Sequence, residues 1–409
     1  MLIDRRLLIK GAAFGLGALS LPAWAQLMNA RGFTHDVASG EPGADRVMLW
    51  TRYVPAAGGS GRLSWEVARD AEFGRVVARG EAHATGERDW CVKPVAEGLP
   101  PGEWFFYRFR DERGATSPIG RTRTLPEGSV SRFNIAVFSC SNLPFGHFNA
   151  YGHAADRQDI DLLLHVGDYI YEYERGKYPT EAEAVAGRII EPAHEIVALA
   201  DYRMRYASYR LDPQLQRLHR NFPMVMMWDD HESANDSWKG GAENHDPATE
   251  GDWNVRKAAA MQACREWLPV SEEPWTSYRI GDLADLFRPE TRLTGRSEQL
   301  DLGAFLSGRQ DIPAALIEFR DTAWLAPERT ILGAEQERWL YDGLRRSVSD
   351  GVRWQVLGQQ IVMGSLSLTP EIAGFLSADA SPQVQMQVKV GLAAAQAGLP
   401  FNLEMWDGY

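Results

Sequence analysis

The sequence predicts an α/β fold in which a small all-β region precedes a larger α/β domain. Short apolar runs separated by turn residues occupy residues 32–127. After about residue 132, apolar runs suited to buried strands alternate with helical stretches. The composition is that of a globular protein, with 44% hydrophobic and 24% charged residues, and 409 residues suffice for two domains.

The first 25 residues are typical of a targeting segment rather than of a folded element. Arg5, Arg6 and Lys10 precede an uncharged stretch, and Ala23-Trp24-Ala25 offers a small-x-small cleavage site. The arginine pair favours a twin-arginine signal over an ordinary secretory signal, which stays the alternative. We therefore expect a signal peptide over 1–25, export through the twin-arginine machinery, and a periplasmic or secreted protein. The apolar run is too short and glycine-rich for a stable membrane span.

Residues 32–127 are expected to form a small β-sandwich. The run Leu63-Ser64-Trp65-Glu66-Val67 alternates apolar and polar residues, as a half-buried strand does. Val47 to Trp50 and Trp104 to Phe109 are further strand candidates, and Pro100-Pro101-Gly102 marks a turn. Several short strands at this spacing are typical of a sandwich. The boundary is expected near Leu125 to Ser129.

Residues 132–409 are expected to form the α/β domain. Phe133 to Phe138, Ile160 to Val166 and Met224 to Trp228 are apolar runs suited to buried strands. Helices are predicted over 253–267 and 335–346. Alternating strands and helices favour a layered α/β domain.

Net charge and cysteine content argue against a nucleic-acid-binding protein and against a disulfide scaffold. The formal charge of −12 disfavours nonspecific nucleic-acid binding, so no nucleic-acid partner is predicted. The three cysteines, Cys91, Cys140 and Cys264, are too few for a disulfide scaffold. We expect free thiols.

Polar clusters follow three of the predicted strands, at the sheet edge where α/β proteins place their sites. The clusters are Phe138-Ser139-Cys140-Ser141-Asn142, His165-Val166-Gly167-Asp168-Tyr169-Ile170-Tyr171-Glu172 and Trp228-Asp229-Asp230-His231-Glu232-Ser233-Ala234-Asn235-Asp236. Each has a structural alternative: Cys140 as a small buried hydrophobe, Asp168 as a helix cap, and Tyr171 as a core residue. Four ionisable groups directly after a buried strand are costly to bury unpaired, which favours a metal site.

The residue types indicate which metals suit the site. Carboxylates and an amide are hard oxygen ligands that suit Ca2+. A thiolate, and a phenolate if Tyr171 is deprotonated, favour Fe3+, while Zn2+ stays an alternative. A multi-metal site at strand ends is suited to hydrolysis at phosphorus.

These segments resemble the alkaline phosphatase D (PhoD-like) family of metallophosphoesterases. The resemblance is carried by Ser139-Cys140, by Gly167-Asp168 with Tyr171, and by Asp229-Asp230-His231-Glu232. It extends to Val37 to Pro42, Leu49 to Arg52, Glu290 to Leu300 and Gly333 to Gln336, and covers most of the chain from about residue 33.

The resemblance implies a four-layer α/β/β/α metallophosphoesterase domain behind an immunoglobulin- or fibronectin-like sandwich. It also implies Fe3+ and Ca2+ as cofactors and a phosphate mono- or diester as substrate. By position, Cys140, Asp168 and Tyr171 would hold the iron, with Asp168 bridging to calcium. Asn235 would be a calcium ligand, and Asp230 takes the place of a metal-binding asparagine.

In the implied mechanism a metal-bound hydroxide attacks phosphorus in line with the leaving group. His231 would be the catalytic residue, either donating a proton to the leaving oxygen or stabilising charge. Arg292 and Arg296 could bind a phosphate oxygen, but we expect surface salt bridges for both.

One departure from the family concerns the last metal ligands. Relatives carry a further Gly-Asp-x-His-like segment, whereas no histidine follows His245 here. We therefore expect that the C-terminal part of the domain is missing, or that a late residue such as Gln359 or Gln360 substitutes. The competing function is an exported non-catalytic or degenerate homologue. A serine hydrolase and a P-loop NTPase are disfavoured because their motifs are absent.

Overall fold

The computed structural model describes residues 30–57, 59–377 and 379–409. The expected signal peptide over 1–25 lies outside the described residues. Within the described part of the chain, no helix combines the length and the apolar character that crossing a membrane requires.

The first strands of the chain belong to two sheets. In the first, β1, β2, β5 and β6 pair antiparallel, and in the second the order is β4-β3-β7-β8. The bounds are β1 Gly32–Gly40, β2 Arg46–Val54, β3 Arg62–Ala68, β4 Val76–His83, β5 Cys91–Val92, β6 Val95–Glu97, β7 Trp104–Asp111 and β8 Gly120–Arg123. A buried apolar cluster contains residues of both sheets, among them Val37, Leu49, Trp65 and Phe105. The predicted strands around 47–50, 63–67 and 104–109 are all present.

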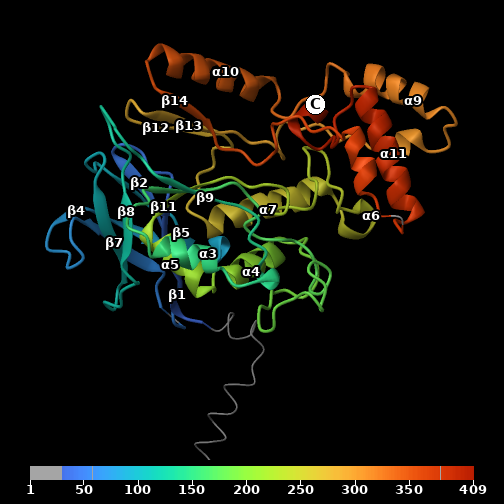
Figure 1. Ribbon diagram of the computed structural model, residues 1–409. Coiled ribbons are helices and arrows are strands. Elements are labelled where there is room, and N and C mark those ends of the chain that lie inside the picture. The colour runs from blue at the N-terminus through green and yellow to red at the C-terminus, as the bar shows by residue number, and fades with distance from the viewer. Residues whose placement is uncertain (1–29, 58, 378) are drawn as a thin grey trace, which may run out of the picture.

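The first of these sheets continues into the α/β part of the chain. Strand β1 pairs in parallel with β11, Pro223–Met226, so that Ser39 lies opposite Pro223. Beyond β11 follow β10, Leu162–His165, and β9, Ile135–Phe138, both parallel to their neighbours. The result is one seven-stranded sheet that joins residues from both expected domains. In Figure 1 the blue N-terminal strands lie close to β11, and β9 forms the far edge of the same sheet.

The two faces of strand β10 contact different layers, because successive side chains of a strand point to opposite faces. Leu163 belongs to a core that includes residues of α3, α4, α5 and α7. Leu162 and Leu164 belong to a second core with Tyr278 and Leu286 of a separate three-stranded sheet. This sheet has the order β12-β13-β14, with β12 Thr276–Ile280, β13 Ala284–Arg288 and β14 Trp354–Leu357.

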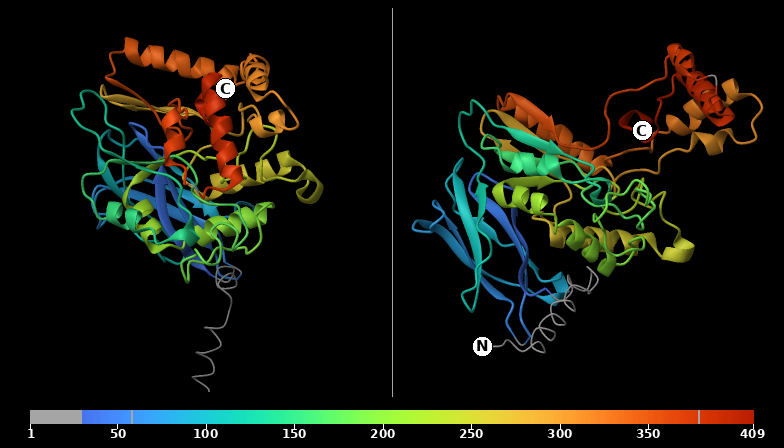
Figure 2. Two further views of the ribbon diagram at one scale, coloured as in Figure 1. Left: turned by 45° about the vertical axis from the view of Figure 1, so that its right-hand side comes forward. Right: turned by 60° about the horizontal axis from the view of Figure 1, so that its bottom comes forward.

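The helices fall into three groups (Figures 1 and 2). The first group precedes the three-stranded sheet in the chain and contains α3 Asn149–Ala155, α4 Leu199–Tyr209, α5 Pro213–Asn221, α6 Pro247–Glu250 and α7 Trp253–Trp267. Helix α10, Ala334–Ser349, packs on that sheet, where Trp339 meets the ring of Phe287 edge to face. The helices α8 Leu302–Leu306, α9 Ile312–Phe319 and α11 Pro382–Gln396 form a smaller apolar cluster of their own.

Candidate metal centre

The loops after β9, β10 and β11 meet at the carboxyl ends of these adjacent strands. The backbone N–H of Cys140 donates to the carbonyl of Gly167 (3.2 Å), and that of Ser141 donates to the carbonyl of Asp168 (2.8 Å). These bonds fasten the β9 loop to the β10 loop. Parallel pairing of β9, β10 and β11 therefore gathers the three polar clusters, as the sequence predicted.

Glu232 fastens the β10 loop to the β11 loop. Its Oε1 accepts from the backbone N–H of Tyr169 (2.5 Å), and its Oε2 accepts from the backbone N–H of Asp229 (2.8 Å). The side chain is buried, and burial raises its pKa well above the ordinary value. A short carboxylate bridge thus sets the spacing between the two loops.

The backbone at the loop tips lies in the left-handed region. Cys140 has φ 56° and Asp168 has φ 55°, a conformation that non-glycine residues adopt at a cost of about 1 kcal/mol or more. The preceding Gly167 has φ 97°, and a Cβ there would lie 2.5 Å from Cβ of Asp229. Only glycine allows the two loops to approach so closely.

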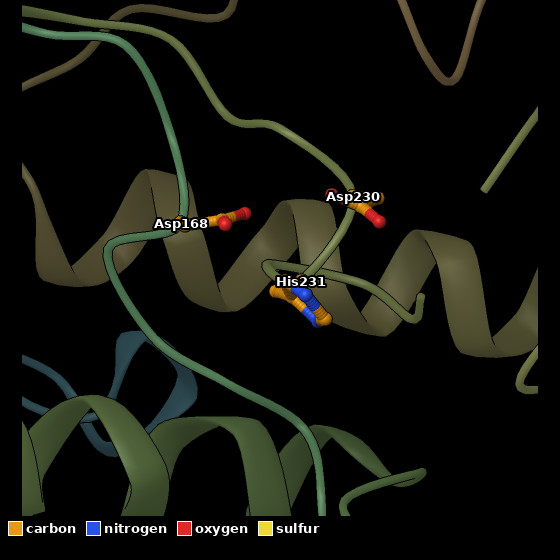
Figure 3. A group of neighbouring side chains, drawn as sticks. All are labelled: Asp168, Asp230 and His231. Carbon is orange, nitrogen blue, oxygen red and sulfur yellow. The ribbon is translucent and has the colours of Figure 1, made fainter. Parts of the chain in front are cut away.

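Asp168, Asp230 and His231 form a cluster that could hold a metal ion. One ligand atom from each lies within 4.8 Å of the other two, and all three residues are largely buried. The side chains come from two neighbouring loops, as Figure 3 shows. The two carboxylates are oxygen ligands for divalent and trivalent cations, and the imidazole adds a ligand only in its neutral form.

The charge around Asp168 fits a bound cation. Its Oδ1 is buried and has no hydrogen-bond partner. Burial raises the pKa of Asp168 to about 6, with His231 lowering it and Asp230 adding to the rise. A carboxylate in this position gains free energy from a nearby positive charge, and a metal ion would supply it.

Cys140 and Tyr171 border Asp168. The Tyr171 hydroxyl donates to Oδ2 of Asp168 (3.0 Å), and burial followed by the charge of Asp168 raises the Tyr171 pKa. Partial burial also raises the pKa of the Cys140 thiol. The neighbouring Asp168 raises this pKa further, whereas Tyr171 lowers it by hydrogen bonding. The structure therefore brings together the three residues for which iron ligation was predicted.

His231 is oriented by a buried carboxylate. Its Nδ1 lies 2.8 Å from Oε2 of Glu172, which is fully buried. Burial alone lowers the pKa of His231, but the bond to Glu172 and the charges of Asp230 and Asp168 raise it to about 10. The imidazolium form is thus stable at neutral pH, with its second nitrogen, Nε2, free of this bond.

Asn235 makes its hydrogen bonds to residues outside the cluster. Its Nδ2 donates to Glu243 (3.1 Å), and its backbone N–H donates to Glu172 (2.7 Å). The neighbouring Asp236 instead bonds the cluster, because its backbone N–H donates to Oδ2 of Asp230 (2.6 Å). Calcium ligation by Asn235 stays a prediction.

The expectation of surface salt bridges for Arg292 and Arg296 is wrong, because both side chains are buried. Nε of Arg292 lies 2.5 Å from Oδ1 of Asp229, and its Nη2 lies 3.6 Å from Oδ1 of Asp230. Burial on its own would raise the pKa of Asp230, but Arg292 and His231 lower it. We expected exposed salt bridges, but residues near the C-terminus, among them Glu404, pack against both arginines and bury them.

Glu172, Glu232 and Arg292 are the supporting residues that the sequence prediction did not select. Two of them were visible as members of the polar runs that follow β10 and β11, but no pattern separated a ligand from a residue that fixes a ligand. Gln360, the candidate substitute ligand, donates through Nε2 to the carbonyl of Trp228 (2.9 Å) and to Thr291 (2.6 Å). Gln359 accepts from Trp406 (3.0 Å).

Comparison with known proteins identifies the family. The profile of the PhoD-like phosphatase family matches residues 135–409, and that of the PhoD-like phosphatase N-terminal domain matches residues 20–126. The chain belongs to the PhoD-like phosphatase family. It is 34% identical over 388 residues to alkaline phosphatase D of Bacillus subtilis (strain 168), an alignment that covers 88% of this chain.

A solved structure of PhoD has a similar fold. The two superpose with a TM-score of 0.71 at 32% identity, over 84% of this chain and 65% of that one. The chain spans 62% of the length of the B. subtilis relative. The shared fold is a mixed α/β fold with several sheets.

Proposed function

We propose that this PhoD-like chain hydrolyses phosphate mono- or diesters with the help of metal ions bound at the loops after β9, β10 and β11. The observation that carries the proposal is the cluster of Asp168, Asp230 and His231 within 4.8 Å at the carboxyl ends of adjacent parallel strands. Membership of the family supports the reaction class.

Fe3+ and Ca2+ are the proposed ions, with Zn2+ as the alternative. Cys140, Asp168 and Tyr171 would hold the iron, while Asp168, Asp230 and Asn235 would face calcium. Bound metal would activate water for attack on phosphorus and neutralise negative charge on the phosphoryl oxygens. The unpartnered Oδ1 of Asp168 supports a cation at this position.

His231 is proposed to act on the leaving group. Its Nδ1–H is held by Glu172 at 2.8 Å, and the raised pKa keeps a proton on Nε2 at neutral pH. This N–H can donate to the leaving alkoxide oxygen or stabilise its charge. Glu232 keeps the two loops at the spacing at which His231 and Asp168 can face one substrate.

The proposal also covers the cellular location of the protein and the architecture of its domains. Export by the twin-arginine route to the periplasm or medium rests on Arg5, Arg6 and Lys10 in the sequence. The four-layer α/β/β/α arrangement is supported by apolar cores on both faces of the seven-stranded sheet. An N-terminal immunoglobulin- or fibronectin-like sandwich is supported by the core that joins the first two sheets.

The test combines metal content and turnover on one sample. We expect the protein from Gln26 onward to contain iron and calcium in near-stoichiometric amounts and to hydrolyse bis-p-nitrophenyl phosphate. Asp168→Asn should lose both metal and turnover, because it removes a charge from the centre of the cluster. Asp156→Asn, an exposed change of the same chemistry, is the matched control.

Two results would count against the proposal. Metal-free folded protein without turnover would favour the non-catalytic homologue. Turnover that survives in Asp168→Asn would move the reaction away from this cluster.

A further inference from the structure

Two buried arginines beside the metal cluster share one carboxylate. Nη2 of Arg292 lies 2.7 Å from Oε1 of Glu404, and Nη2 of Arg296 lies 3.6 Å from the same oxygen. Arg296 also donates to the backbone carbonyl of Glu404 (2.8 Å). Because Arg292 pairs with Asp229 and Asp230 as well, the Glu404 carboxylate lies one ion pair away from the cluster.

Glu404 does not satisfy the arginine pair, since its Oε1 is itself buried and has no hydrogen-bond partner although it lies within ion-pair distance of both guanidinium groups. Nη1 of Arg292, and Nε and Nη1 of Arg296, are buried and have no hydrogen-bond partner. A buried guanidinium N–H without an acceptor is costly, so these donors favour an additional anion. A tetrahedral oxyanion presents several oxygens and can satisfy two guanidinium groups at once, which one carboxylate does not do here.

Glu404 is the most exposed member of the group, although its Oε1 is buried. Its side chain is 28% exposed, whereas those of Arg292 and Arg296 are 4% and 0% exposed. The chain that directly follows Glu404 is anchored by three hydrogen bonds. Trp406 donates to Gln359 (3.0 Å), Arg329 donates to the carbonyl of Gly408 (2.9 Å), and the Tyr409 hydroxyl donates to the carbonyl of Ser297 (3.1 Å).

We propose that Arg292 and Arg296 form an oxyanion site next to the metal cluster, and that the Glu404 carboxylate occupies it as an internal competitor of the substrate phosphate. The inference rests on the proposed function for the identity of the anion. A phosphate oxygen and Glu404 bind the same two guanidinium groups in turn. The side chain of Glu404 rotates toward solvent while the anchored backbone segment stays in place.

The test measures equilibrium binding of inorganic phosphate by calorimetry to the wild type and to Glu404→Gln, each with its metal content determined. Removing the competing charge at nearly constant shape should tighten phosphate binding about tenfold. Glu335→Gln, which neutralises an exposed carboxylate on α10, should leave phosphate affinity unchanged. Adding Arg296→Gln to Glu404→Gln should remove the gain.

Unchanged or weaker phosphate binding by folded Glu404→Gln overturns the inference, whether or not its metal content falls. If Glu404→Gln does not fold, Glu404→Asp retracts the carboxylate and should still tighten phosphate binding; no gain there overturns the inference too. Because binding is read without turnover, tighter phosphate binding in a protein that hydrolyses no ester would retain this site and reject only the proposed function.

Discussion

Glu172 holds Nδ1 of His231 at 2.8 Å from a position with no solvent exposure. Burial on its own would raise the pKa of Glu172, but the hydrogen bond with His231 outweighs it and the pKa is lowered. The pair is therefore ionic. Glu172 also accepts from the backbone N–H of Asn235 and from the side chain of Asn244. One carboxylate therefore orients the imidazole and the loop that follows it.

If His231 acts on the leaving group as proposed, Glu172→Gln should lower kcat for bis-p-nitrophenyl phosphate by about 10- to 100-fold, the usual cost of removing a group that orients an active-site residue. The amide has no charge to stabilise the imidazolium of His231. Glu174→Gln, an exposed change two residues away, is the control and should leave kcat within about twofold. Equal effects of the two substitutions would contradict an orienting role.

Gly167→Ala should destabilise the fold by about 2–4 kcal/mol and reduce metal content. The alanine Cβ would meet the backbone N and the Cβ of Asp229, both at 2.5 Å, at a φ of 97° that L-residues rarely adopt. Urea unfolding and elemental analysis provide the two readouts. Gly146→Ala is the matched control, because its backbone is extended and no atom lies within 4 Å of the added Cβ.

The three thiols should differ in reactivity. In the structure none of them forms a disulfide; Cys140 is exposed, and Cys91 and Cys264 are buried. A thiol reagent should modify one cysteine in the native protein and three after unfolding. If Cys140 holds iron, its modification should accelerate after metal removal, since a ligating thiolate is protected. Rapid native labelling of more than one thiol would contradict the burial of Cys91 and Cys264.

Acid should destabilise the protein through His165. Burial lowers the pKa of His165 to about 3, while an unfolded histidine titrates near 6.5. Between these values the unfolded chain binds the extra proton, so stability falls as pH falls, by about 2 kcal/mol from pH 6.5 to pH 5. Urea unfolding of the wild type and of His165→Gln at both pH values isolates this contribution. A variant that loses as much stability as the wild type would refute it.

Local sequence patterns were sufficient for most elements. The helix predicted over 253–267 has the bounds of α7, and that over 335–346 lies within α10, because their apolar periodicity and N-terminal signals are local. The strands at 133–138, 160–166 and 224–228 are shorter in the structure but present as β9, β10 and β11. The meeting of Asp168, Asp230 and His231 follows from parallel pairing of these strands.

Other features depend on contacts that a local pattern does not contain. The burial of Arg292 and Arg296 arises from residues 402–409, more than 100 positions later in the chain, which cover them. The partner of Asn235 is Glu243 because a loop returns past it. Similarly, the parallel pairing of β1 with β11 joins strands that nothing in their sequences links.

That last pairing also dictates an order of events during folding. Ser39 has its partner, Pro223, only after more than half of the chain has been synthesised. Until then one edge of the N-terminal sheet has unpaired backbone groups, which are prone to pair with other chains. Closure of such a distant contact is slow. We therefore expect the first 130 residues to fold poorly alone and to depend on the rest of the chain for a closed edge.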